Sequence, residues 1–130
     1  MSFTSLGLLT KTLEYASANN GIYIVRQKEV IELKSDKMPV GMHTEEIKPF
    51  TYSKVQLQQG DVVYTYTDGY PDQFGGPKGK KFKYKQFTEQ LGVISQQNIL
   101  IQKGNLSKVF DDWKGTLEQV DDVTVIGIIV

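Results

Sequence analysis

The stretch that most constrains the fold is residues 60–69, GDVVYTYTDG, in which a turn opens a run of six β-branched or aromatic residues. Residues 62–67 contain no lysine, glutamate or proline, which is typical of a strand covered on both faces. The last eight residues, 123–130, form a second near-continuous run of this kind. If the two runs pair as antiparallel neighbours, the end of the first meets the start of the second.

This pairing would bring acidic residues together. Asp68 ends the first run, and Asp121 and Asp122 stand directly before the second. Opposed residues on paired strands have Cβ atoms about 4.5–5.5 Å apart, and two carboxylates that close repel unless a cation lies between them. Taken alone, each acidic motif is most often a solvated turn. Their joint position at one rim predicts a divalent metal site with Asp68 and Asp121 as ligands.

The remaining pattern predicts an α+β domain. We expect strands at 2–9, 13–16, 22–26 and 30–33 that form a β-meander. A later strand at 47–57 should pair with the 61–68 strand through a turn at 58–60. After a loop over 70–83, apolar residues recur at helical spacing from Tyr84 to Ile94, and a second helix has Ser95 as its N-cap and a break near Gly104. The fold class is therefore a mostly antiparallel β-sheet with two helices inserted before the last strand.

Composition excludes several classes of function. At 130 residues the chain is one domain, and its 15 basic residues balance its 15 acidic ones, so we expect no nucleic acid and no membrane contact. Without cysteine, and with His43 as the sole histidine, the chain has no thiolate site and no serine or cysteine nucleophile paired with a second histidine. The apolar cluster at residues 6–9 is too short for a signal peptide or a transmembrane helix. We expect a soluble chain.

A basic loop follows the first acidic motif. Residues 75–81, GGPKGKK, do not have the spacing of a phosphate-binding P-loop. Nearby aromatic residues make a surface for single-stranded nucleic acid conceivable, but their helical spacing favours core packing. Near a metal-binding rim, the loop could instead recruit a phosphorylated substrate through Lys78, Lys80 and Lys81.

Several motifs in order resemble one known family. Residues 60–69 and 121–124, together with segments at 16–21, 38–41, 70–76, 113–115 and 119–120, are similar to the SpoIIE-type branch of the metal-dependent (PPM, type 2C-like) serine/threonine phosphatases. The resemblance implies part of a β-sandwich flanked by helices, in which a pair of Mn²⁺ or Mg²⁺ ions activates water for attack on phosphoserine or phosphothreonine. Asp68 and Asp121 match metal ligands of the family, and Gly69 and Asp122 match supporting positions.

The resemblance also carries expectations about the whole protein. Such domains belong to cytoplasmic parts of bacterial signalling proteins, and their substrates are phosphorylated anti-sigma-factor antagonists. The family's bridging aspartate and its Gly-His-Gly-like stretch have no counterpart here, so we expect residues 1–130 to be the C-terminal part of the domain, inactive by itself and with its metal positions empty. The alternative is a non-catalytic protein-binding module. Unpaired strand edges predict a homo-oligomer in either case.

Overall fold

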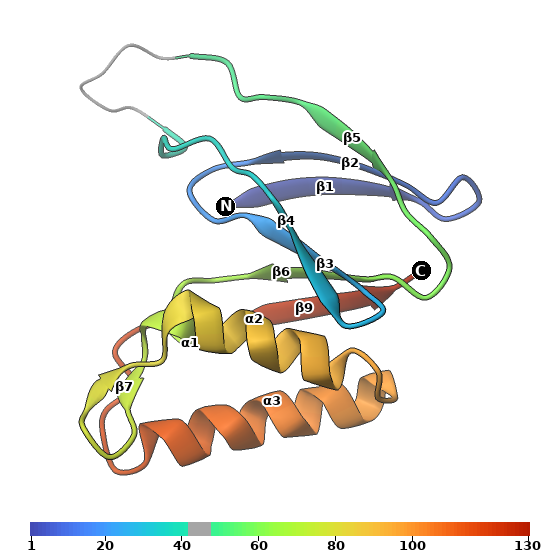
Figure 1. Cartoon of the computed structure of the whole chain (residues 1–130). Helices are drawn as coiled ribbons and strands as arrows, with labels where there is room; N and C mark the ends of the chain where they lie inside the picture. The colour runs from blue at the N-terminus through green and yellow to red at the C-terminus, as the bar shows by residue number, and fades with distance from the viewer. Residues whose placement is uncertain (42–47) are drawn as a thin grey trace.

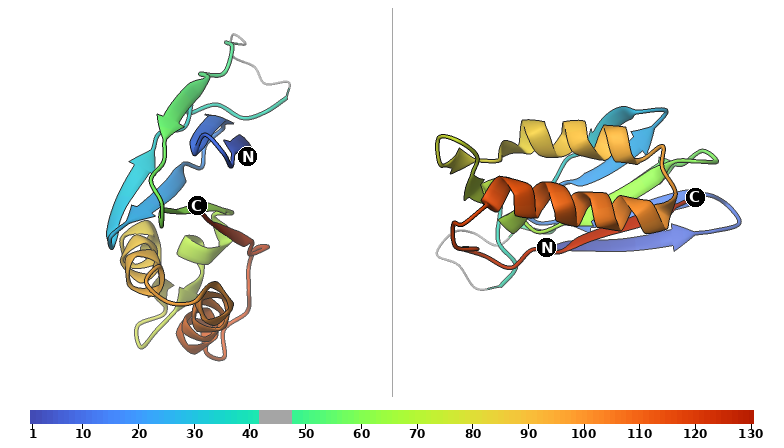
Figure 2. Two further views of the ribbon diagram at one scale, coloured as in Figure 1. Left: turned by 90° about the vertical axis from the view of Figure 1, so that its right-hand side faces the viewer. Right: turned by 90° about the horizontal axis from the view of Figure 1, so that it is seen from below.

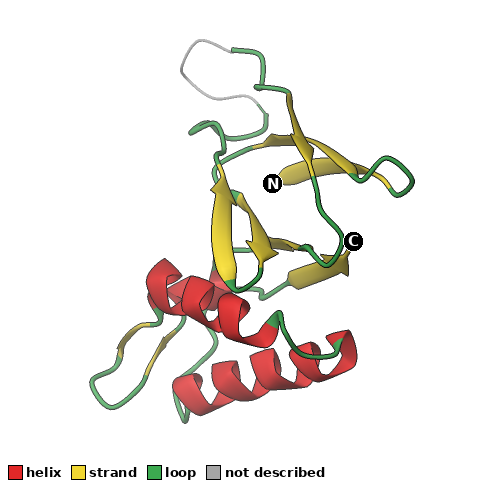
Figure 3. Cartoon of the chain, turned by 45° about the vertical axis from the view of Figure 1, so that its right-hand side comes forward, coloured by secondary structure: helices red, strands yellow, loops and turns green. Residues whose placement is uncertain are grey.

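The computed structural model describes residues 1–41 and 48–130, in which two β-sheets pack face to face and helices cover one outer face (Figures 1 and 3). The first sheet has the order β1 (Ser2–Gly7), β2 (Thr12–Ser17), β5 (Ser53–Gln56). The second has the order β4 (Glu29–Leu33), β3 (Ile22–Arg26), β6 (Val62–Tyr66), β9 (Val125–Ile129). The α+β prediction is confirmed. His43 and part of the predicted 47–57 strand lie outside the described residues.

Helices α2 (Lys83–Ile94) and α3 (Ile99–Lys114) lie side by side against the second sheet, as the two views of Figure 2 show. Both come before the last strand, as predicted. The predicted loop over 70–83 contains more structure than expected, namely a one-turn helix, α1 (Gly69–Asp72), and a small hairpin of β7 (Phe74–Gly75) and β8 (Lys80–Lys81).

Strand β6 is central because it contributes to both apolar cores. Val63 packs between the sheets with Leu13 and Ile24, whereas Tyr64 and Tyr66 point into the layer between the second sheet and the helices. All three β6 residues are at most 8% exposed. The prediction of an internal strand covered on both faces is confirmed.

The helix-side core is largely aromatic. Tyr23 and Tyr66 stack with ring centroids 5.1 Å apart, and Phe87 of α2 meets the Tyr66 ring edge-on at the same centroid distance. Tyr70 of α1 continues the cluster, with its ring centroid 4.9 Å from that of Phe87 and 5.0 Å from that of Phe110. Aromatic pairs at these distances add about 0.5–1.5 kcal/mol each beyond area burial, so this cluster fixes α1, α2 and α3 against β6.

Two predicted strand pairings are wrong. The first four strands do not form one meander, because β1 and β2 pair in the first sheet and β3 and β4 in the second. Strand β5 pairs with β2 rather than with β6, so residues 58–60 carry the chain from one sheet to the other. This turn is closed by a side chain, since Asp61 Oδ2 accepts from the Gln58 N–H at 2.8 Å and Gly60 takes φ +86°. In sequence alone, a short polar turn of this kind looks the same as the turn of a β-hairpin, and for this reason the pairing of β5 with β6 was predicted.

The boundary between the two helices was also predicted in the wrong place. Ser95 ends α2, whereas Asn98 caps α3, its Oδ1 accepting from the Leu100 N–H at 3.0 Å. Helix α3 continues through Gly104 without a break. Nothing lies within 4 Å of the position that a Cβ atom would take at Gly104, so this residue is on the open face of the helix. A glycine inside a helix lowers helix stability by about 1 kcal/mol relative to alanine, and packing of the rest of α3 offsets this loss.

An ion pair between a buried carboxylate and a partly exposed arginine fixes the start of β6 to β3. Asp61 is 1% exposed and receives two hydrogen bonds from the Arg26 guanidinium, at 2.9 and 2.7 Å. The hydrogen bond from Arg26, aided by the Gln58 N–H, holds the pKa of the Asp61 carboxyl below its ordinary value although burial opposes this. The pair therefore anchors the crossing between the sheets.

We expect Asp61→Ala to lower the free energy of unfolding by about 2–3 kcal/mol at pH 7, because hydrogen bonds to a charged group are lost. A carboxyl whose pKa is lowered by folding stabilises the fold above its unfolded pKa, and this stabilisation is lost as the pH falls through the folded pKa. The difference in free energy of unfolding between wild type and variant, measured with urea, should therefore have its full size above the ordinary carboxyl pKa of 3.8 and become smaller at lower pH. An equal gap at pH 7 and pH 2 would contradict the assignment.

Candidate functional site

The pairing of β6 with β9 brings Asp68 and Asp121 to the same end of the second sheet. The strands are antiparallel with Tyr66 opposite Val125, and the ladder continues for one more pair, since the Thr67 N–H donates to the Thr124 carbonyl at 3.0 Å. Asp68 follows this pair directly, and Asp121 comes three residues before Thr124. Both aspartates are exposed. The predicted placement at one solvent-facing rim is therefore what the structure shows.

Thr67 and Gly69 hold the two acidic segments together. The Thr67 hydroxyl donates to the Asp122 carbonyl and accepts from the Thr124 N–H, each at 2.9 Å. A Cβ atom at Gly69 would collide with the Asp122 carbonyl oxygen, so only glycine permits this approach. Gly69 and Asp122, predicted as supporting positions, meet here through the Asp122 backbone.

The two candidate ligands are presented differently. Asp68 stands at the start of α1, where its carbonyl accepts from the Asp72 N–H at 2.9 Å and its carboxylate caps no helical N–H. Asp121 Oδ1 accepts from the Asp122 N–H at 2.7 Å, and the Asp121 carbonyl accepts from the Gln119 side chain at 2.9 Å. The Asp121 carboxylate is thus oriented by its own turn.

The carboxylate oxygens of Asp68 and Asp121 are of the type that a hard divalent cation binds, but they are few. Carboxylate oxygens are the ligands that Mg²⁺ and Mn²⁺ prefer. Within residues 1–41 and 48–130, no group of three or more acidic or histidine side chains is close enough to hold a metal ion. Asp68 and Asp121 can therefore supply part of a ligand set and need further oxygen donors.

The sequence model of the family described as Stage II sporulation protein E (SpoIIE) matches residues 1–130, the whole chain. The chain belongs to the SpoIIE family. No curated protein matches it.

Solved structures agree with this assignment. The SiaA-PP2C domain of Pseudomonas aeruginosa is similar over 99% of this chain at 25% identity and a TM-score of 0.89. The phosphatase domain of the cell fate determinant SpoIIE from Bacillus subtilis matches over 100% at 12% identity (TM-score 0.73), and the RsbU and RsbW domains of Rv1364c from Mycobacterium tuberculosis match over 97% at 18% identity (TM-score 0.74). The latter two likenesses show the fold alone.

This SpoIIE-family chain spans only part of those structures. It covers 50% of the SiaA-PP2C chain, 56% of the SpoIIE phosphatase chain and 34% of the RsbU–RsbW chain. The part of the chain that the structure describes contains no helix long and apolar enough to cross a membrane.

Lys81, predicted as part of the substrate loop, and Tyr84, which was not predicted as a site residue, lie near the first acidic motif. Lys81 forms an ion pair with Asp72, Nζ to Oδ1 3.2 Å, and its Nζ lies 5.8 Å from the centroid of the Phe74 ring. Burial, followed by the negative charges of Asp72 and Asp68, raises the pKa of the Tyr84 hydroxyl. Asp72, four residues after Asp68, is therefore paired with Lys81, and the charges of both carboxylates act on the Tyr84 hydroxyl.

The base of the basic hairpin is fixed to α3. The Gly76 N–H donates to the Trp113 carbonyl at 2.8 Å, and Trp113 Nε1 donates to the Gln73 carbonyl at 3.1 Å. A Cβ atom at Gly75 would overlap the Trp113 backbone, which explains the glycine pair. Lys78 and Lys80 are exposed beyond this base, on the same hairpin as Lys81.

We expect Gly69→Ala to unfold more easily than wild type and to shift the backbone of residues 121–123, because the added methyl group meets a backbone carbonyl that cannot move aside cheaply. Gly104→Ala is the matched control, since the same change in open helical space should stabilise by about 0.5–1 kcal/mol. Urea unfolding measures both, and amide chemical shifts report the backbone of 121–123. If the two variants moved stability in the same direction, the close approach of Gly69 to Asp122 would be wrong.

Proposed function

We propose that the chain is the C-terminal part of a metal-dependent protein serine/threonine phosphatase domain, with Asp68 and Asp121 as metal ligands. The observation that carries this is the β6–β9 pairing, which places both aspartates at one exposed rim of a chain that the family model matches throughout. The likeness to SiaA-PP2C, which extends over 99% of the chain, supports the same function.

Each group at the rim has a proposed task. When bound, Mn²⁺ or Mg²⁺ would lower the pKa of a water molecule and neutralise charge on the phosphoryl oxygens. Asp68 and Asp121 hold the metal, and the Thr67 hydroxyl fixes the distance between their two segments. The exposed cations of Lys78 and Lys80 attract the phosphorylated substrate, since local positive charge raises the concentration of an anionic ligand.

The proposal extends to the whole protein. We place the complete domain in a cytoplasmic bacterial signalling protein whose substrate is a phosphorylated protein of the anti-sigma-factor antagonist type, because the solved relatives include an RsbU–RsbW pair and a cell fate determinant. The chain of 130 residues is inactive by itself, since two carboxylates are too few fixed oxygens for two ions. It forms a homo-oligomer.

A protein-binding module is the second candidate, and one observation favours it. Large apolar side chains are exposed on one edge strand of each sheet, among them Phe3 of β1 and Ile126 and Ile128 of β9, at 78%, 53% and 41%. A surface of this kind marks an interaction site whether or not the chain carries metal.

Activity of a longer protein that contains the complete domain tests the proposal. We expect that protein to hydrolyse a phosphoserine peptide with Mn²⁺, and Asp68→Asn or Asp121→Asn to reduce kcat/KM by about 100-fold or more, as loss of a group that stabilises developing charge does. The matched control is Asp112→Asn, which removes an exposed carboxylate paired with Lys108 on α3 and should leave activity unchanged.

The 130-residue chain should show no turnover in the same assay. Equal activity of Asp68→Asn and Asp112→Asn in the longer protein would refute the ligand assignment and favour the binding module. Turnover by the 130-residue chain that Asp68→Asn abolishes would show that this chain completes the ligand set, with Asp72 as the first residue to test.

A further inference from the structure

The segment between α3 and β9 carries Asp121 and contains no helix or strand. In the described part of the chain, two residues outside α3 donate hydrogen bonds to its backbone carbonyl groups. On one side of Asp121, Gln73 Nε2 donates to the Glu118 carbonyl at 2.9 Å. On the other side, the Thr67 hydroxyl donates to the Asp122 carbonyl at 2.9 Å. Asp121 therefore lies between two points of attachment.

Both donors belong to the stretch of chain that carries Asp68. Thr67 directly precedes Asp68, and Gln73 follows it immediately after α1. A segment that is held at one point can rotate about that point, whereas a second attachment also fixes its direction. The pair of hydrogen bonds from Thr67 and Gln73, which we call the clamp, therefore sets both the distance and the orientation of the Asp121 segment relative to Asp68.

The backbone of Gln73 gives the clamp a rigid base. Gln73 is 0% exposed, and its carbonyl accepts two hydrogen bonds. One comes from the Phe82 N–H at 2.9 Å, directly after the basic hairpin, and the other from Trp113 Nε1 at 3.1 Å, near the end of α3. A buried residue that is fixed on two sides holds its side-chain amide in one place, so the amide determines where Glu118 lies.

The orientation of the Gln73 amide is determined by its neighbours. Nε2 donates to the Phe74 carbonyl at 3.0 Å as well as to the Glu118 carbonyl. The reversed amide would place Oε1, which is only an acceptor, against the same two carbonyl oxygens. Gln73 therefore holds Glu118 as a donor, and an apolar side chain of the same size could not do so.

We infer that Gln73 is a positioning residue for Asp121, and that it acts through the Glu118 backbone without touching metal or substrate. The inference rests on the proposed function, because that function makes Asp121 a metal ligand. Groups that orient a ligand change metal affinity by about 10–100-fold when they are removed. The clamp itself is a property of the metal-free chain and can be tested without any ion.

Gln73→Met tests the clamp in the 130-residue chain without metal. Methionine keeps an unbranched side chain but has no N–H group, so the Glu118 carbonyl loses its donor. We expect the backbone order parameters of residues 118–121, measured by amide NMR relaxation, to fall from about 0.85 toward about 0.6. The order parameters of β6 should not change.

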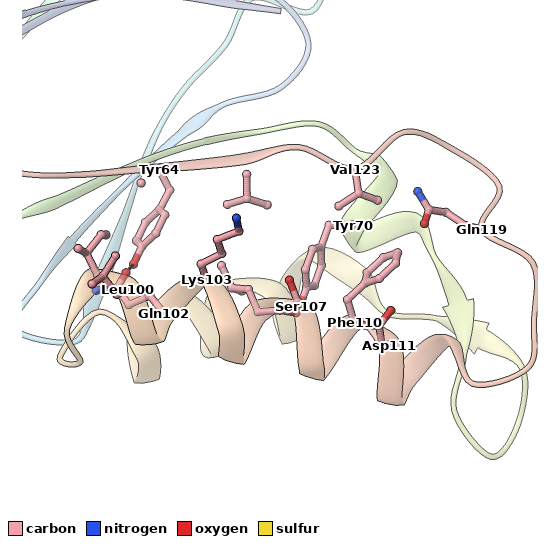
Figure 4. Close-up of a pocket in the computed structure, with 14 residues that line it drawn as sticks. Tyr64, Tyr70, Leu100, Gln102, Lys103, Ser107, Phe110, Asp111, Gln119 and Val123 are labelled. Carbon is pink, nitrogen blue, oxygen red and sulfur yellow. Dashed lines mark hydrogen bonds between the residues drawn. The ribbon is translucent and has the colours of Figure 1, made fainter.

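Gln102→Met is the matched control. Gln102 is also buried, at 2% exposed, and its side chain also makes two hydrogen bonds, from the Tyr64 hydroxyl at 2.6 Å and to the Gln97 carbonyl at 2.9 Å. Figure 4 shows it at the opposite end of the pocket beside α3 from Gln119, which lies two residues before Asp121. This variant should lower the urea midpoint by a similar amount and leave the Asp121 segment as ordered as in wild type.

Metal affinity is the second readout, in the longer protein that contains the complete domain. Gln73→Met should raise the Mn²⁺ concentration for half-saturation at least about tenfold, as measured from the electron paramagnetic resonance signal of free Mn²⁺. Saturating Mn²⁺ should restore most of the phosphatase activity of this variant. Gln102→Met should leave the half-saturating concentration unchanged.

Equal loss of order at residues 118–121 in the two variants, or no loss in either, would overturn the inference. Should Gln73→Met fail to fold, Gln73→Asn is the second variant, since its amide is one methylene shorter and is withdrawn from Glu118, and the same results are expected. A wild-type longer protein that binds no Mn²⁺ would refute the metal assignment in the proposed function. The order parameters of the metal-free chain would then still decide whether Gln73 positions the Asp121 segment.

Discussion

The antiparallel contact between β6 and β9 is the interaction on which the rest of the structure depends. It joins segments about 60 residues apart in sequence, and α1, the basic hairpin, α2 and α3 are all inserted between them. Because β6 also pairs with β3 and packs against both cores, a one-residue slip in its register would turn Val63 and Tyr64 to the wrong layers. The same register brings Asp68 to the segment that contains Asp121.

The strongest local patterns predicted the fold well. Six β-branched or aromatic residues define β6, and the steps of three and four residues from Tyr84 to Ile94 define α2. The wrong predictions of strand pairing and of the helix boundary lie where a single side chain, rather than a periodic pattern, determines the path of the chain. Asp61 closes the turn after β5 and sends the chain to another sheet, and Asn98 rather than Ser95 caps α3. Which of two nearby polar residues caps a helix depends on the tertiary path of the chain, which composition and spacing do not contain.

At the site, sequence could predict the two acidic motifs but not what holds them. The positions of Asp68 and Asp121 follow from strand ends alone. The Thr67 hydroxyl bridge and the fit of Gly69 against the Asp122 carbonyl depend on the exact strand register. Likewise, the ion pair between Lys81 and Asp72 requires the hairpin to fold back toward α1, a long-range contact with no periodic signal.

The central claim is that the rim formed by Asp68 and Asp121 binds a divalent cation, and paramagnetic broadening by Mn²⁺ tests it most directly. We expect the metal positions of the 130-residue chain to be empty without added metal, but added Mn²⁺ that binds weakly and exchanges rapidly still broadens the amide NMR signals nearest to where it binds. The account predicts the strongest broadening at Asp68, Gly69 and Asp122, with little at Glu29, which lies on the hairpin at the opposite end of the sheet. Strongest broadening at another acidic surface, or signals that all broaden equally, would contradict it.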